Sequence, residues 1–229
     1  MHFLILGGTG FLGARTVEFA LERGHSVTLF TRGKTSATRF ADEPRVTHLV
    51  GDRDPEVGAG LEALTRLAES GAHFDAVLDV SGYLPRHVAA STKCLAPLTP
   101  TYLFISSVSV YDAPVPNGVD ERGALIRLAD PSVEEITPET YGGLKVLCEE
   151  LVREHAGSAT LIVRPGILAG PDDFTDRFSY WVWAADAARG RELLCPGDPS
   201  DPTQVLEAAD LGLWLVELCE RGSQAVRNT

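Results

Sequence analysis

Apolar and polar positions follow two different patterns along the first two thirds of the chain. Short uninterrupted apolar runs are typical of strands buried on both faces of a sheet, whereas apolar residues recurring every three or four positions are typical of amphipathic helices. The expected strands cover 2–6, 26–31, 46–51, 74–80, 101–107 and 159–164. The expected helices cover 11–23, 61–70, 85–95 and 137–155. Strand and helix alternate, which predicts an α/β fold with a doubly wound parallel sheet.

The last third of the chain departs from this alternation. We expect a helix over 174–188, a short strand at 193–194 and a helix from a capping Asp210 to Cys219. Residues 224–229 have the pattern of a strand that has just begun. Because aromatic residues and prolines dominate the first half of this region, we expect a small separate lobe there. Its members include Phe178, Trp181, Trp183 and the segment 193–205.

A glycine-rich turn joins the first expected strand to the first expected helix. Gly7 permits a tight turn, Gly10 allows the backbone to approach a pyrophosphate, and Gly13 allows the helix to lie close to the strand. The N-terminus of the helix also offers free N–H groups to an anion. A glycine turn without a ligand is the alternative, but the strand-turn-helix context favours a dinucleotide site.

The end of the second expected strand indicates which dinucleotide is bound. A carboxylate at this position would accept hydrogen bonds from the ribose 2′-OH of NAD. This chain instead has Arg32 and Lys34 at the strand end, and no acidic residue. Two cations suit the additional phosphate of NADP, so we favour NADP, with NAD as the alternative. An exposed basic turn without a ligand would have the same residues.

Further candidate cofactor contacts follow the other expected strands, at the edge where parallel sheets bind ligands. Asp52, after the third strand, is placed to accept the exocyclic amine of adenine, although an aspartate in a turn before Pro55 is an equal interpretation. The remaining candidates are Thr9, Phe11, Leu12, Arg53, Val80, Ser81, Gly82, Ser106, Pro165 and Ile167.

The candidate catalytic residues lie on the helix expected over 137–155 and before it. Tyr141 and Lys145 are four residues apart, so a helix places both on one face. An ammonium close to a phenol lowers the pKa of the phenol and prepares it to exchange a proton with an alcohol or carbonyl. Ser107, at the end of the fifth expected strand, is placed to bond the same reacting oxygen. A core tyrosine beside a solvated lysine is the more common reason for such spacing.

Four motifs in this order resemble the extended and atypical short-chain dehydrogenase/reductases, also described as the NAD-dependent epimerase/dehydratase family. They are Gly-Gly-Thr-Gly-Phe-Leu-Gly at 7–13, Ile-Ser-Ser-Val-Ser-Val-Tyr at 105–111, Tyr-Gly-Gly-Leu-Lys at 141–145 and Arg-Pro-Gly at 164–166. The resemblance implies that Ser107, rather than Ser106 or Ser109, is the catalytic hydroxyl. It also implies that Tyr141 moves the proton, that Lys145 binds the nicotinamide ribose as well, and that hydride is exchanged without a metal.

The resemblance also implies a division of the chain. Residues 1–170 are expected to form a dinucleotide-binding Rossmann domain, and residues 171–229 mainly a C-terminal substrate lobe with some segments returning to the Rossmann sheet. Members of the family usually extend beyond the length of this chain, so we expect the lobe to be incomplete. The lack of an acid near Arg32 is unlike the NAD-bound sugar-nucleotide epimerases and more like the NADP-dependent reductases of the family.

Composition excludes several other classes of protein. The formal net charge is −12, and the basic residues form no long block, which argues against a nucleic-acid partner. The chain has no apolar run of the ~20 residues that a bilayer requires, which argues against a membrane protein. The four cysteines are scattered, as in reduced proteins, so we expect a cytoplasmic protein without a metal site. For the assembly, we leave open the formation of a homodimer.

Three hypotheses about function follow. The first is an NAD(P)-dependent oxidoreductase acting on a carbonyl or hydroxyl of a small metabolite, with nucleotide sugars among the candidate substrates. The second is a sugar-nucleotide epimerase or dehydratase in which bound NAD is regenerated in each cycle. The third is a relative without catalysis that senses NADP or associates with RNA. Intact Ser107, Tyr141 and Lys145 argue against the third hypothesis.

Overall fold

A six-stranded parallel sheet forms the centre of the computed structural model, which describes residues 1–115, 118–198, 200 and 203–227. The strand order is β3-β2-β1-β4-β5-β6, and all neighbouring strands are parallel. The strands are β1 His2–Leu6, β2 Ser26–Thr31, β3 Val46–Val50, β4 Ala76–Asp79, β5 Tyr102–Ile105 and β6 Thr160–Val163. This order is that of a Rossmann fold, so the predicted doubly wound sheet is confirmed.

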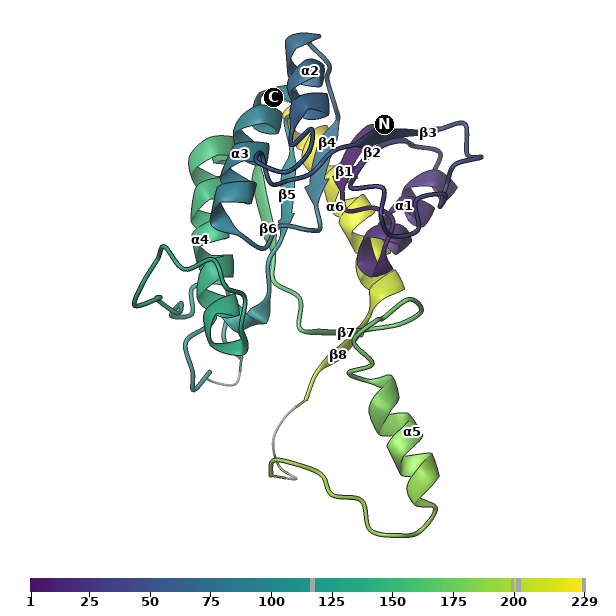
Figure 1. Ribbon diagram of the computed structural model, residues 1–229, viewed down its shortest axis with the longest axis vertical. Coiled ribbons are helices and arrows are strands. Elements are labelled where there is room, and N and C mark those ends of the chain that lie inside the picture. Colours follow the sequence, from purple (N-terminus) through teal and green to yellow (C-terminus); the bar gives the residue numbers. More distant parts are fainter. Residues whose placement is uncertain (116–117, 199, 201–202, 228–229) are drawn as a thin grey trace.

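Helices cover both faces of the sheet (Figure 1). One face carries α1 (Phe11–Glu22) and α6 (Ala208–Arg227), which lie side by side. The other face carries α2 (Glu62–Glu69), α3 (Pro85–Leu95) and α4 (Pro138–Ala156). The expected helices over 11–23, 61–70, 85–95 and 137–155 are therefore all present, with small differences at their ends. Among the described residues, no helix combines the length and apolarity that crossing a membrane requires.

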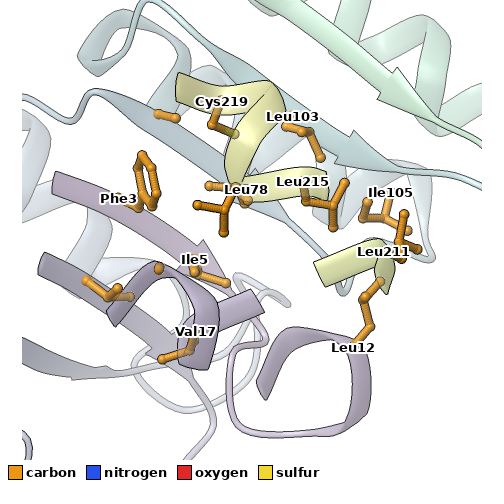
Figure 2. Packing of buried hydrophobic residues seen from close by; sticks show 14 of the residues in the cluster. Phe3, Ile5, Leu12, Val17, Leu78, Leu103, Ile105, Leu211, Leu215 and Cys219 are labelled. Atoms are coloured by element: carbon orange, nitrogen blue, oxygen red, sulfur yellow. The ribbon is translucent and has the colours of Figure 1, made fainter. Parts of the chain in front are cut away.

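The core under α1 and α6 explains why the C-terminal helix returns to the sheet. Figure 2 shows Phe3 and Ile5 of β1 facing Leu215 and Cys219 of α6 across the face that Val17 of α1 also covers. All five side chains are completely buried. Burial of a large aliphatic or aromatic side chain stabilises a fold by about 1.5–3 kcal/mol, so this helix belongs to the stable core of the sheet. On the opposite face, Leu4 and Leu6 alternate with these residues along the same strand.

The segment between β6 and α6 leaves the body of the molecule and returns to it (Figure 1). Two short parallel strands, β7 (Ile167–Ala169) and β8 (Val205–Glu207), form its base, and α5 (Ser179–Ala188) extends away from the sheet. We call residues 170–204 the arm. Trp181 is 38% exposed and Trp183 is 68% exposed, so the arm presents aromatic surface rather than burying it.

The structure corrects four sequence predictions in the last third of the chain. Residues 193–194 are irregular rather than a strand, and 224–227 continue α6 rather than beginning a strand; residues 228–229 lie outside the described part. The helix expected from 174 begins at Ser179. Asp210 does not cap α6, because the carboxylate of Glu207 accepts the hydrogen bonds of the first-turn amides instead. Short segments that mix polar and apolar residues carry too little periodicity to tell a strand from an irregular segment or to locate the end of a helix.

Candidate functional site

The glycine turn between β1 and α1 has the geometry of an anion cradle. Gly7 has a φ of +91°, a conformation that favours glycine, and a Cβ on Gly13 would lie 2.1 Å from the Gly7 carbonyl oxygen. A Cβ on Gly10, in contrast, would meet no atom within 4 Å. Gly10 also gives the first turn of α1 no side-chain cap, so that N-terminus keeps N–H groups for an anion. The residues present therefore fit a pyrophosphate.

The end of β2 lies beside this turn. Thr9 donates a hydrogen bond from its hydroxyl to the carbonyl oxygen of Thr35, at 3.2 Å, which holds the segment after β2 against the glycine turn. Arg32 and Lys34 are exposed, and in the described part of the chain neither forms an ion pair. Arg39, further along this segment, is already paired with Glu18 and Asp172. Two cations without acidic partners among the described residues thus lie in the segment held against the glycine turn.

The segment after β3 carries the candidate adenine contact. One carboxylate oxygen of Asp52 accepts the backbone N–H of Asp54 at 3.0 Å, which is the hydrogen-bonding pattern of an aspartate turn. The next acid, Asp54, is bound by both terminal nitrogens of Arg86 and is not available to a ligand. Asp52 therefore forms the aspartate turn, and its contact with adenine stays a prediction.

The helix that carries Tyr141 begins as the sequence predicted. The Thr137 hydroxyl accepts the backbone N–H of Glu139 and of Thr140, and the Thr140 hydroxyl accepts the backbone N–H of Thr137, which forms a capping box. Pro138 occupies the first helical position, where its missing N–H costs nothing. The cap fixes the start of α4 and therefore the position of Tyr141 in its first turn.

The structure brings Ser107 and Tyr141 together. Ser107 precedes the short 3₁₀ turn Val108–Val110 after β5, and its hydroxyl accepts the backbone N–H of Ser109 at 3.1 Å. Burial raises the pKa of Tyr141, and this shift is opposed by a hydrogen bond from Ser107 and by the positive charge of Arg177 in the arm. The lowered pKa that the sequence predicts is therefore not found in this form of the molecule, because burial exceeds the favourable contacts.

Lys145 lies deeper than the sequence predicts. The residue is 2% exposed, and its ammonium donates to the carbonyl oxygens of Gly82 and Ile105, both at 2.6 Å. It also lies over the Phe104 ring, 4.2 Å from the centroid. Burial lowers the pKa of Lys145 from 10.5 to about 8. The lysine is thus fixed between the turn after β4 and the end of β5.

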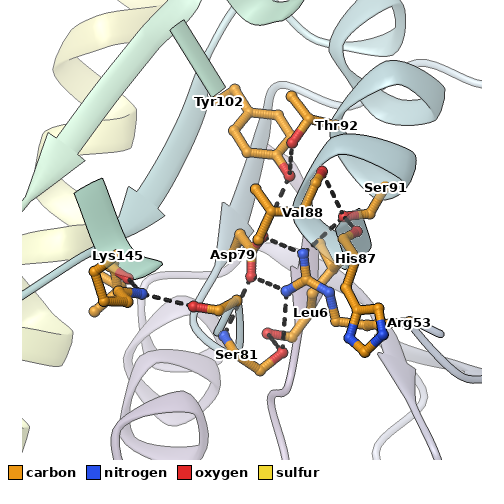
Figure 3. A network of polar contacts seen from close by, with 12 residues as sticks. Leu6, Arg53, Asp79, Ser81, His87, Val88, Ser91, Thr92, Tyr102 and Lys145 are labelled. Carbon is orange, nitrogen blue, oxygen red and sulfur yellow. Dashed lines mark hydrogen bonds and ion pairs between the residues drawn. The ribbon is translucent and has the colours of Figure 1, made fainter. Parts of the chain in front are cut away.

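The sequence missed a buried ion pair that involves one of the candidate cofactor residues. Arg53 contacts both carboxylate oxygens of Asp79, the last residue of β4, and donates to the Ser91 hydroxyl at 2.7 Å. Figure 3 shows this network, in which Arg53 connects Asp79 at the end of β4 to Ser91 of α3. Asp79 is completely buried. The signal in the sequence was the charged Asp79 directly after the apolar residues 76–78 of the expected strand.

A second buried ion pair supports the break after β6. The Arg164 guanidinium binds both oxygens of Glu149 on α4, at 2.8 and 2.6 Å, and donates to the Tyr111 hydroxyl at 3.1 Å. The Pro165 carbonyl oxygen accepts the backbone N–H of Val108 at 3.0 Å. Two of the four sequence motifs, those at 105–111 and 164–166, therefore meet here. Ser106 lies in the same region, and Ile167 opens β7 as an exposed residue.

Comparison with known proteins identifies the family. The model of the NAD dependent epimerase/dehydratase family matches residues 3–221, and the chain belongs to this family. The chloroplast stem-loop binding protein of 41 kDa b from Arabidopsis thaliana is 33% identical over 118 residues, which is 47% of this chain. The match covers only 29% of the length of the plant protein.

Solved structures agree on the fold. A putative epimerase from Burkholderia cenocepacia aligns with a TM-score of 0.71 and 20% identity, covering 96% of this chain and 72% of that one. UDP-glucuronic acid 4-epimerase from Bacillus cereus, solved in complex with NAD, aligns with a TM-score of 0.68 and 16% identity, covering 96% and 73%. At such identities the similarity concerns the fold, and it confirms the Rossmann-like architecture.

Proposed function

We propose that this protein is an NADP-dependent oxidoreductase that transfers hydride between nicotinamide and a carbonyl or hydroxyl group of a small metabolite. The observation that carries the proposal is the meeting of Ser107, Tyr141 and Lys145 at the carboxyl edge of the sheet, beside a glycine cradle that fits a pyrophosphate. Family membership supports the dinucleotide, and the intact triad supports chemistry rather than binding alone.

Each member of the triad has a distinct role in this proposal. Bound nicotinamide supplies or accepts the hydride. Tyr141 gives its phenolic proton to the reacting oxygen in reduction and takes it back in oxidation. Ser107 donates a hydrogen bond to the same oxygen and orients it. Lys145, one helical turn beyond Tyr141, would reach the ribose with its third N–H. The aromatic arm supplies part of the substrate wall.

Cofactor preference follows from the charges at the end of β2. Arg32 and Lys34 have no ion-pair partner among the described residues, so they are available to a 2′-phosphate. The related epimerase structure contains NAD, so the competing candidate is a sugar-nucleotide epimerase or dehydratase with NAD retained through the cycle. NAD that copurifies with the protein would favour this competitor, because a reductase exchanges its cofactor in each turnover.

Replacement of Tyr141 by Phe tests the proposed catalysis. The ring and its packing remain, so the variant should fold and bind NADPH as the wild type does. Oxidation or reduction of the active substrate, found with a panel of sugar nucleotides and carbonyl compounds, should fall by about 100- to 10,000-fold, since the proton-transfer group is lost. Full activity in the variant would show that another group moves the proton.

One comparison favours a second candidate function. The plant relative is named for binding a stem-loop, and the match covers about half of this chain. An RNA-associated role is therefore worth testing directly, although the net charge of −12 opposes attraction to phosphate. Filter binding to a stem-loop RNA at low and moderate salt decides it: binding above the background of a protein of equal negative charge would establish this role.

A further inference from the structure

Arg53 and Asp79 connect two loops that the proposed cofactor site needs. Arg53 belongs to the segment after β3, directly following Asp52, and Asp79 ends β4. The contact is bidentate: each terminal nitrogen of the guanidinium binds one carboxylate oxygen. Ser91 of α3 accepts a third hydrogen bond from Arg53, at 2.7 Å. Tyr102 of β5 donates its hydroxyl to Asp79 at 3.4 Å.

The same carboxylate holds the turn that follows β4. One oxygen of Asp79 accepts the backbone N–H of Ser81 at 3.2 Å, and the Ser81 hydroxyl donates to the carbonyl oxygen of Leu6 at 3.2 Å. The next carbonyl oxygen, that of Gly82, accepts the Lys145 ammonium. Hydrogen bonds at both ends thus connect Arg53 and Lys145 through the backbone of the Ser81–Gly82 turn, as Figure 3 shows.

The turn also touches the glycine cradle. A Cβ on Gly7 would lie 2.7 Å from the Cβ of Ser81, so the two turns are in close contact. A Cβ on Gly82 would lie 2.6 Å from the Phe104 ring and 3.2 Å from the Asp79 carboxylate. There is consequently no space for the turn to shift toward the sheet. Movement outward is opposed by the Asp79 carboxylate, together with the Ser81–Leu6 and Lys145–Gly82 hydrogen bonds.

We propose that Arg53 and Asp79 form a positioning pair that fixes the Ser81–Gly82 turn, and through it the Lys145 ammonium, at the edge of the sheet. The functional part of this inference rests on the proposed dinucleotide site. Arg53 then acts on the cofactor through the turn rather than by contact, because its terminal nitrogens are engaged with Asp79 and Ser91.

Stability alone does not explain such a pair. Removing two charges from water is costly, and buried ion pairs replaced by apolar residues of similar volume often leave a protein as stable or more stable. A hydrophobic pair would fill the space between α3 and β4 equally well. What a hydrophobic pair lacks is a directional acceptor for the Ser81 N–H, and this is the property on which the position of the turn depends.

The test therefore removes both charges together. Arg53→Met with Asp79→Leu leaves no unpaired buried charge, whereas either single substitution leaves one and is expected to unfold the protein partly. Arg86→Met is the matched control, because Arg86 makes the same bidentate contact with Asp54 in the same loop but does not touch the turn. Circular dichroism establishes that both variants are folded.

Hydrogen exchange in the protein without ligand is the first readout. Amides of residues 81–83 should exchange about tenfold faster or more in the double variant, while amides of β1 keep their protection and Arg86→Met matches the wild type. Unchanged exchange at 81–83 in a folded double variant overturns the proposal. If the double variant does not fold, Arg53→Lys takes its place. This substitution retains the positive charge but loses the bidentate contact with Asp79, so exchange at residues 81–83 should again become faster, by a smaller factor.

Ligand binding is the second readout. The double variant should bind NADPH about tenfold more weakly, whereas 2′,5′-ADP, which carries only the adenosine half, should lose less than about threefold. Equal losses for the two ligands contradict the positioning role. A wild type that binds neither NADPH nor NADH defeats the proposed function instead, and exchange at 81–83 still decides whether the pair holds the turn.

Discussion

Gly142 lies directly against Ser109: a Cβ on residue 142 would come within 2.1 Å of the Ser109 carbonyl oxygen. Only glycine permits the first turn of α4 to approach the 3₁₀ turn after β5 this closely. Because Ser107 precedes that turn and Tyr141 precedes Gly142, the contact brings the two candidate catalytic hydroxyls together. The pairing of these hydroxyls thus depends on a residue that has no side chain of its own.

Gly142→Ala should consequently disturb both the fold and the site. The new methyl group cannot avoid a backbone oxygen, so α4 must move outward, and we expect a loss of about 1–3 kcal/mol in the free energy of unfolding, as for other overpacked sites. Urea denaturation measures this loss. Gly166→Ala is the control, since a Cβ there meets no atom within 4 Å. A Gly142→Ala variant as stable as Gly166→Ala would contradict the close contact.

The sheet was predictable from the sequence because its signal is local and repeated. Most strands of the sheet contain a short apolar run, with the partly exposed β3 the exception, and β1 has its interior residues completely buried, as an uninterrupted run predicts. The helix cap at Thr137 and the glycine turn were predictable for the same reason, because each is marked by residues that are close together in the sequence. The arm was not predictable in detail, since a three-residue strand such as β8 has no periodicity and forms only when β7 lies beside it.

The candidate site was predictable only where a motif marks it. Ser107, Tyr141 and Lys145 follow spacing rules, and the structure places them at one edge. The partners that hold them were not visible: Asp79 ends a strand and Glu149 lies within α4, and each binds an arginine 15 or more residues away in the chain, although Glu149 also pairs with Arg153 one helical turn further on. Such long-range pairs leave no pattern in a single sequence, so the depth of Lys145 and the raised pKa of Tyr141 were missed.

Alanine at two glycines of the cradle should separate binding from folding. Gly10→Ala adds a methyl group that meets nothing in the protein, so stability should be within about 1 kcal/mol of the wild type, while the methyl group takes the space of the pyrophosphate and NADPH affinity falls tenfold or more. Gly13→Ala forces a Cβ against the Gly7 carbonyl and should lower stability itself. Thermal unfolding and fluorescence titration check both. NADPH affinity unaffected by Gly10→Ala would exclude this cradle.

The charges after β2 should determine cofactor preference. NADPH should bind more tightly than NADH by about 1–3 kcal/mol, and Arg32→Ala with Lys34→Ala should remove most of this difference while affecting NADH little. Raising the salt concentration should weaken NADPH binding more than NADH binding, since the exposed contacts are screened. Arg66→Ala, which removes an exposed arginine of α2, serves as the control. Equal affinities of the wild type for both cofactors would favour the NAD-bound epimerase.

The burial of Lys145 should make stability depend on pH in a defined window. The pKa of this lysine is lowered from 10.5 to about 8 by burial, so below pH 8 the folded protein carries the full cost of a buried ammonium. Between pH 8 and 10.5 the folded state has released the proton while the unfolded state still binds it. Stability contributed at this site therefore rises with pH across the window, by about 3 kcal/mol in total.

Comparison with Lys145→Met isolates this contribution, because other groups titrate in both proteins and cancel to first order. The free energy of unfolding of the wild type minus that of the variant, measured with urea at pH 7, 8.5 and 10, should increase steadily above pH 8. Cys148 is the neighbour to watch, since its raised pKa of about 12 is itself held down by the Lys145 charge; the measurements therefore stop at pH 10, where that thiol is still protonated. A difference that stays constant from pH 7 to 10 would mean that the ammonium is solvated, and that the two carbonyl oxygens of Gly82 and Ile105 do not hold it at the edge of the sheet.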